Sequence, residues 1–114
     1  MIPEITTQEF ENKVLRSPEP VLVDFHATWC MPCRMLAPVL EKLSQEFAGR
    51  VKFVKVNVDE EYALAATYEV SGVPTLKLFQ NGVCVETWVG LRPPREIQAR
   101  LEAVSGNPVP SPSI

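Results

Sequence analysis

The sequence has no cluster of lysines and arginines, no long uncharged apolar run and only one histidine. Its 11 basic and 14 acidic residues leave a formal net charge of -3. We therefore expect no nucleic-acid partner, because no basic surface is predicted to neutralise phosphates. We also expect no membrane partner, since no segment approaches the roughly 20 apolar residues that a spanning helix needs. The start, MIPE, has no basic region followed by an apolar one, so we expect no signal peptide.

Cysteine is scarce as well, with only Cys30, Cys33 and Cys84 in the chain. An odd number without an export signal does not fit the disulfide framework of a small secreted protein. We therefore expect a reducing, cytoplasmic location, where two closely spaced thiols are more often catalytic or metal-binding than a static crosslink. A zinc site needs four ligands, and one cysteine pair, a distant cysteine and a single histidine do not supply a usual set. We expect no metal.

The chain does have the length of one domain and enough apolar residues for a core, since 46% of its 114 residues are hydrophobic. We assign residues 1–105 to this domain. The last residues, 106–114, are rich in proline and serine and are expected to form a disordered tail.

The hydrophobic pattern predicts strands and helices in alternation. Strands are expected at 21–25, 51–58, 75–80 and 83–89, with a weaker edge strand at 4–5; helices are expected after a capping box at 6–9, at 30–48, at 59–68 with Asp59 as N-cap, and after Pro93. Strands separated by helices imply parallel pairing, while Asn81-Gly82 suits the turn of an antiparallel hairpin. The predicted fold class is α/β, with a mixed central sheet and helices on both faces.

Cys30 and Cys33 are predicted at the junction between the strand at 21–25 and the following helix. A close cysteine pair is a structural disulfide, part of a metal site or a redox couple, and its place at a helix N-terminus favours the redox couple. The unpaired N–H groups there stabilise a thiolate, so Cys30 is expected to have a lowered pKa and to be the attacking sulfur. Cys33, one turn further, is expected to be more deeply buried and to resolve the mixed disulfide. Pro32 stiffens the turn between them.

Two charged residues lie in the middle of predicted apolar strands, Asp24 and Lys55. One explanation for each residue is a purely structural role, as a buried charge that is paired with neighbouring groups. If the two are buried together behind the cysteine pair, a second explanation applies. A buried carboxylate has a raised pKa and can take the proton from Cys33 as that thiol attacks, and Lys55 would temper the shift.

At this point the sequence resembles the thioredoxin family. The matching segments follow one another in family order and span residues 1–105: VDF at 23–25, A-x-WC-x-PCR at 27–34, AP at 37–38, KVNVD at 55–59, Y-x-V at 68–70, GVPT at 72–75, LF-x-NG at 78–82 and VG at 89–90. The resemblance implies a thioredoxin fold, with a mixed five-stranded central sheet flanked by four helices. It also implies general reduction of protein disulfides, with Cys30 as nucleophile, Cys33 as resolving thiol, Asp24 as proton acceptor and Lys55 as its partner.

The resemblance further implies a substrate-binding surface around the cysteines. Pro74 corresponds to the family's cis-proline, which faces the dithiol, and the backbone of Val73 would pair with an extended substrate chain. The docking patch would contain Trp29, Gly72, Val73, Pro74, Val89 and Gly90. From the residues alone, Trp29 fits the core equally well.

Three residues leave questions open. Met31 replaces the family's usual glycine and is either an adaptable apolar contact for substrates or an innocuous substitution. His26 stands where the family commonly has an aromatic residue and shares a strand face with Asp24, so it either tunes the pKa of the dithiol or packs as a hydrogen-bonded residue. Cys84 is expected to be a small buried hydrophobe that shares a strand face with Trp88, with a reactive or dimer-forming thiol as the alternative.

The sequence therefore predicts a general dithiol–disulfide oxidoreductase that needs no bound cofactor, since the electrons reside on the Cys30–Cys33 pair. Its expected partners are disulfide-containing target proteins and a thioredoxin reductase, and it is expected to be a monomer. One alternative is an oxidase or isomerase on the same fold, although such relatives commonly have histidine at the position of Pro32. A second alternative is a redox-independent binding subunit.

Overall fold

The computed structural model describes residues 1–106, in which strands and helices alternate along the first half of the chain. The elements are α1 (Thr7–Phe10), η1 (Glu11–Leu15), β1 (Val21–His26), α2 (Met31–Glu46), β2 (Lys52–Asn57), α3 (Tyr62–Thr67), β3 (Thr75–Gln80), β4 (Val83–Val89) and α4 (Pro94–Val104). The π-helical turn η1 follows α1 directly, so the two form one helical segment. The expected tail lies outside the described residues from position 107 onward.

The four strands form one mixed sheet in the order β2-β1-β3-β4. β1 is parallel to β2 and antiparallel to β3, and β3 and β4 form an antiparallel hairpin. The hairpin turn has positive φ at both Asn81 (53°) and Gly82 (81°), as a type I′ turn requires. The predicted mixed sheet is confirmed.

The fifth strand that the family resemblance implies is reduced to a single bridge. Glu4 pairs in parallel with Lys55, through hydrogen bonds of 2.8 Å from Ile5 N to Lys55 O and from Lys55 N to Pro3 O. Proline has no N–H to continue the ladder, and α1 begins at Thr7, so the pairing stops at this point. The bridge nevertheless fixes Glu4 beside β2.

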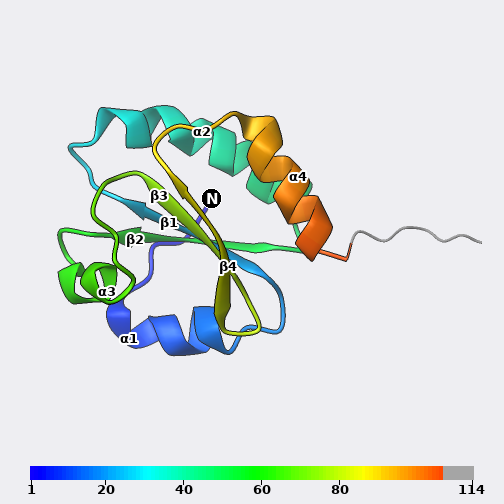
Figure 1. Cartoon of the computed structure of the whole chain (residues 1–114), viewed down its shortest axis with the longest axis horizontal. Helices are drawn as coiled ribbons and strands as arrows, with labels where there is room; N and C mark the ends of the chain where they lie inside the picture. Colours follow the sequence, from blue (N-terminus) through cyan, green and yellow to red (C-terminus); the bar gives the residue numbers. More distant parts are fainter. Residues whose placement is uncertain (107–114) are drawn as a thin grey trace, which may run out of the picture.

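The sheet is covered by helices on both faces, with α2 and α4 on one side and α1 and α3 on the other (Figure 1). In β1 the side chains alternate between the two layers. Leu22 packs in the cluster with α2 and α4, whereas Val21, Val23 and Phe25 pack in the opposite cluster. The same alternation directs Asp24 and His26 toward α2.

The prediction that Cys84 and Trp88 share a face of the sheet is wrong, because β4 contains a β-bulge between them. The register shifts so that Leu78 pairs with Glu86 but the next residue, Phe79, pairs with Cys84. The extra residue changes the face of the sheet to which the side chains before it point. Cys84 therefore packs against one core cluster, while Trp88 belongs to the other. The two side chains therefore lie on opposite faces of the sheet. Cys84 is only partly buried, so the predicted full burial is wrong, but its contact with this core cluster favours the packing role.

The short helix α3 begins later than predicted, because its N-cap is Glu61 and not Asp59. The carboxylate of Asp59 instead accepts a hydrogen bond of 2.8 Å from the indole N–H of Trp29. Asp59 therefore does not cap a helix but connects the segment after β2 to the loop before α2.

We predict that Leu78→Ala lowers the free energy of unfolding by about 2–5 kcal/mol, because Leu78 is fully buried in the middle of β3 and its loss leaves a cavity. The matched control is Leu91→Ala, the same change at a half-exposed site, which should cost within about 0.5 kcal/mol. Urea denaturation of the oxidised protein measures both. Equal losses in the two variants would contradict this account of the core.

Candidate functional site

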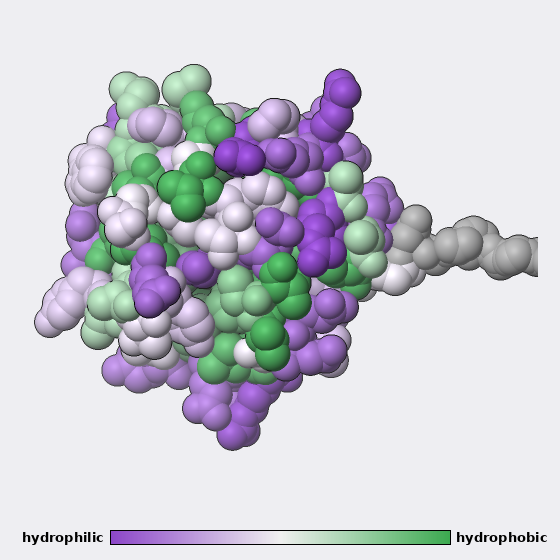
Figure 2. Space-filling view, in the orientation of Figure 1, coloured by the Kyte–Doolittle hydropathy of each residue, from purple (hydrophilic) through white to green (hydrophobic). Residues whose placement is uncertain are grey.

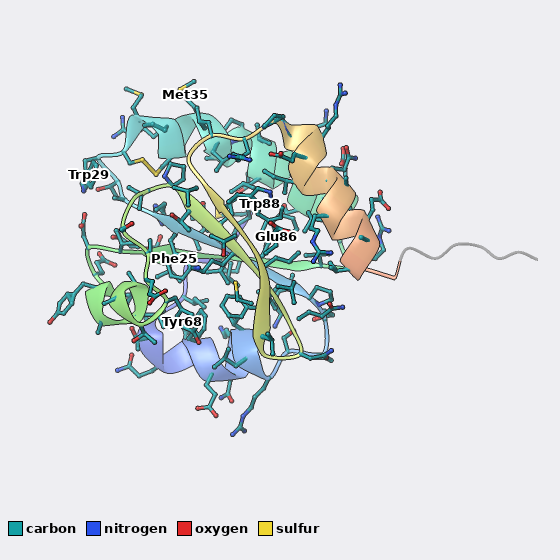
Figure 3. All side chains as sticks on the ribbon, viewed as in Figure 1. Phe25, Trp29, Met35, Tyr68, Glu86 and Trp88 are labelled. Carbon is teal, nitrogen blue, oxygen red and sulfur yellow. A yellow bond between two sulfur atoms is a disulfide. The ribbon has the colours of Figure 1, made fainter. Side chains whose placement is uncertain are left out.

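Cys30 and Cys33 are joined by a disulfide at the start of α2, with their Cα atoms 5.2 Å apart. Cys30 is the N-cap residue of the helix, and its sulfur accepts a hydrogen bond of 3.1 Å from the backbone N–H of Cys33. Figure 3 shows the disulfide beneath the first turn of α2, close to Trp29. The predicted position of the pair at a helix N-terminus is confirmed.

The two sulfurs lie in a small apolar cluster with Ala27, against which Val58 and Val73 pack. Cys30 is only 3% exposed and Cys33 7%. The prediction that Cys33 is the more deeply buried of the two is therefore wrong for the oxidised form. The loops that carry Val58 and Val73 pack against the pair, which explains why both cysteines are covered. After reduction, the N–H group that already points at the Cys30 sulfur can stabilise a thiolate there.

Asp24 lies on β1 directly opposite Lys55 in the parallel register with β2. Its side chain is buried, and its Oδ1 has no hydrogen-bond partner within the described part of the chain. Burial raises the pKa of Asp24 to about 7, and the positive charge of Lys55 partly offsets this shift. A carboxyl group with this pKa can both take up and release a proton near neutral pH.

A cavity of about 320 Å³ lies between the sheet and α2 and brings Asp24 to the same space as Cys33. The ionisable residues that line it are Asp24, His26, Cys33, Arg34, Glu41 and Lys55. Two of these have other partners, since Arg34 donates to the carbonyl of Thr28 and Glu41 accepts from the N–H of Ile2. The cavity therefore connects the resolving cysteine, the buried acid and the unusual histidine.

His26 is largely buried, with its side chain 12% exposed. Burial lowers the pKa of its imidazole, and the nearby charge of Lys55 lowers it further, while Glu4 raises it. The Oε1 of Glu4 lies 3.5 Å from Nε2, within ion-pair distance but long for a hydrogen bond. His26 is therefore neutral at neutral pH and has a buried ring nitrogen that can accept a proton.

Apolar side chains that solvent can reach surround the disulfide. Trp29, Met31 and Val89 are each at least 60% exposed, so Trp29 is not a core residue. Gly72 is also exposed, while Val73 and Gly90 are half-buried. Figure 2 shows hydrophobic and neutral surface gathered over the start of α2 and the loops beside it.

The loop before β3 passes beside the disulfide and contains a cis peptide bond between Val73 and Pro74. The predicted cis-proline is confirmed. The carbonyl of Pro74 accepts a hydrogen bond of 2.8 Å from the N–H of Gly90, and the hydroxyl of Thr75 donates to the carbonyl of Gly72 at 2.6 Å. These bonds hold the loops at 72–75 and 89–90 together.

Sequence reasoning missed three residues around this site. Met35 and Leu91 are exposed large apolar residues, and each has a signal in the sequence. Met35 lies one helical turn after Met31, and Leu91 follows Val89-Gly90. Glu4 was missed as a neighbour of His26, because the contact depends on the bridge between Glu4 and Lys55.

Residues 1–106 contain neither a membrane-spanning helix nor a cluster of metal ligands. None of the helices there combines the length and apolar character that crossing a membrane requires. In the same residues, no group of three or more histidine, cysteine, aspartate and glutamate side chains is arranged to hold a metal ion.

Comparison with known proteins gives a consistent match over nearly the whole chain. The family model named Thioredoxin matches residues 1–103. Thioredoxin from Haemophilus influenzae is 48% identical over 93 residues, which are 82% of this chain and 87% of the relative. Thioredoxin 1 from a Nostoc strain is 43% identical over 87% of this chain and 92% of the relative, and thioredoxin from a Synechocystis strain is 44% identical over 88% and 94%.

We predict that the contribution of Asp24 to the free energy of unfolding of the oxidised protein falls as the pH rises from about 4 to about 8. The pKa of Asp24 is higher in the folded than in the unfolded chain, so the folded state binds the extra proton and loses this stabilisation as the pH rises through about 7. The fall attributable to Asp24 is up to about 4 kcal/mol, since one pKa unit corresponds to about 1.4 kcal/mol.

The difference in unfolding free energy between wild type and Asp24→Asn isolates this contribution. The two proteins should differ little near pH 4, where both side chains are uncharged, and the variant should become the more stable one as the pH rises. Urea denaturation at a series of pH values measures the difference. A difference that does not vary with pH would contradict the raised pKa.

Proposed function

Because the chain belongs to the thioredoxin family and is a thioredoxin-type dithiol–disulfide oxidoreductase, we propose that its site residues divide the work of reducing a target disulfide as follows. The thiolate of Cys30 attacks one sulfur of the target and forms a mixed disulfide. The other target sulfur leaves as a thiolate. Cys33 then attacks Cys30, which releases the reduced target and leaves the Cys30–Cys33 disulfide.

The observation that carries this proposal is the disulfide at the N-cap of α2, next to the cavity that contains Asp24. Asp24 is the proton acceptor for Cys33, since both line one cavity and the pKa of Asp24 is raised to about 7 by burial. Lys55, opposite Asp24, limits that shift and keeps the carboxylate accessible near neutral pH.

Substrates bind on the apolar surface around the disulfide. Its members are Trp29, Met31, Gly72, Val73, Val89 and Gly90, together with Pro74, which is buried in the same loop as Val73. The exposure of Trp29, Met31 and Val89 supports this role, because such side chains bury apolar area against a partner. The backbone of Val73 pairs with the extended chain of the target, as an added strand does. Met31 contributes a flexible contact that adapts to different targets.

The remaining features concern the setting of the reaction. The protein acts as a monomer in the cytoplasm, with no bound cofactor and no metal. A thioredoxin reductase returns two electrons to the disulfide after each cycle. Nothing in the site favours an oxidase or isomerase, and Pro32 is retained between the cysteines.

We predict that Cys33→Ser traps target proteins on Cys30 as mixed disulfides, because the thiol that would release them is absent. The experiment uses a Cys84→Ser background, so that adducts cannot form on the third cysteine. Adducts should be visible on a non-reducing gel and disappear with dithiothreitol, and the wild-type chain should reduce insulin disulfides. Cys30→Ser is the matched control and should trap almost nothing; equal trapping by the two variants would contradict the assigned roles.

A further inference from the structure

The cavity beside Cys33 contains a second titratable side chain that the proposed reaction does not use. His26 is two residues after Asp24 on β1, and both side chains project toward α2. Asp24 Oδ1 and His26 Nε2 are buried side-chain atoms without a hydrogen-bond partner among the described residues. Because both side chains line one cavity of about 320 Å³, which has room for water, water can bridge them.

His26 also has a defined neighbour on its outer side. The Oε1 of Glu4 lies 3.5 Å from Nε2, and the Glu4 side chain is 43% exposed against 12% for His26. Glu4 is held in place by its backbone bridge to Lys55. Asp24, His26 and Glu4 therefore form a series that leads from the buried acid to the surface.

The other charged groups around His26 come from three directions. Lys55 lies opposite Asp24 on β2, and Arg34 and Glu41 line the cavity from α2. Glu60, in the segment after β2, favours the protonated imidazole, and Lys55 opposes it. Arg34 is occupied by the carbonyl of Thr28, and Glu41 by the N-terminal backbone. Glu4 touches the imidazole at 3.5 Å and has a larger effect on its pKa than Glu60, so Glu4 is the acid best placed to stabilise a charged imidazole.

We propose that His26 is a positioning residue that carries protons between Asp24 and solvent, with Glu4 stabilising the intermediate imidazolium. This inference rests on the proposed role of Asp24 as the proton acceptor of Cys33. His26 does not touch the reacting sulfurs; it acts by returning Asp24 to its ionised form.

The steps balance without another reactant. As Cys33 attacks Cys30, its proton goes to the Asp24 carboxylate, the bond between Cys33 and Cys30 forms, and the bond from Cys30 to the target breaks. The target leaves as a thiolate with the electron pair and takes a proton from solvent. The proton on Asp24 then passes to the unprotonated ring nitrogen of His26, directly or through water, and the imidazolium releases a proton to solvent on the side of Glu4. A neutral imidazole suits this task, and burial keeps the pKa of His26 below its ordinary value.

The test follows the two thiol-exchange steps separately. Reduced protein carrying Cys84→Ser is mixed with a chromogenic aromatic disulfide in a stopped-flow instrument, where the first coloured release reports attack by Cys30 and the second reports resolution by Cys33. Near pH 6, Asp24 begins mostly protonated and must lose its proton before it can act. Near pH 9 it begins ionised, and no relay is needed.

We predict that His26→Phe slows the second release about tenfold near pH 6 and less than about twofold near pH 9, and leaves the first release unchanged. His26→Gln, which keeps a polar group beside Glu4 but cannot carry a proton, should behave in the same way. Glu4→Gln should give a smaller defect with the same pH dependence. The matched control is Glu41→Gln, on the same cavity, whose amide oxygen still accepts the N–H of Ile2 and which should match wild type.

Two further measurements separate proton transfer from packing. In an Asp24→Asn background, His26→Phe should have no additional effect on the second release, because the group it serves is absent. Imidazole added to His26→Ala should restore the rate near pH 6. Equal slowing at both pH values, slowing that persists in the Asp24→Asn background, or wild-type rates in His26→Gln would overturn the relay. A wild-type protein without a second release, or Asp24→Asn without any defect, would instead contradict the proposed function.

Discussion

The parallel register between β1 and β2 is the constraint on which the site depends. It puts Asp24 directly opposite Lys55 in a strand that is otherwise apolar, and the alternation of β1 directs both Asp24 and His26 toward α2. A shift of one residue would move every side chain of β1 to the other face and bury Asp24 in the opposite core, beside Val54 and Val56 of β2, with no cysteine near it. The hydrophobic pattern of the sheet therefore also determines where the acid lies relative to Cys33.

Much of this arrangement could be predicted from the sequence, because it follows from short-range patterns. The strands at 75–80 and 83–89, the turn at Asn81-Gly82 and the N-cap position of Cys30 depend on residues next to one another. The bulge in β4 and the loss of a fifth strand could not be predicted in this way. The bulge depends on how β4 pairs with a partner strand, and the strand is lost because Pro3 cannot extend the ladder.

In the site, too, some features follow from short-range sequence patterns and others depend on tertiary contacts. The cysteines and Asp24 were identified because their residue types are informative at those positions. The role of Asp59 was missed, because its bond to Trp29 joins two loops that lie 30 residues apart in the sequence. The contact between Glu4 and His26 likewise depends on tertiary structure, since it requires the N-terminal bridge to β2. The burial of Cys30 was underestimated for a similar reason, as the loop at Val73 covers it.

The bulge in β4 has a consequence for how copies of this protein behave at high concentration. β4 is an outer strand of the sheet, and its sequence, VCVETWV, is largely apolar, so a regular edge there would expose evenly spaced backbone groups to another strand. The bulge interrupts that spacing between Cys84 and Glu86, and the ion pair of Glu86 with Arg100 places charged side chains beyond it. The same irregularity that separates Cys84 from Trp88 therefore discourages edge-to-edge aggregation.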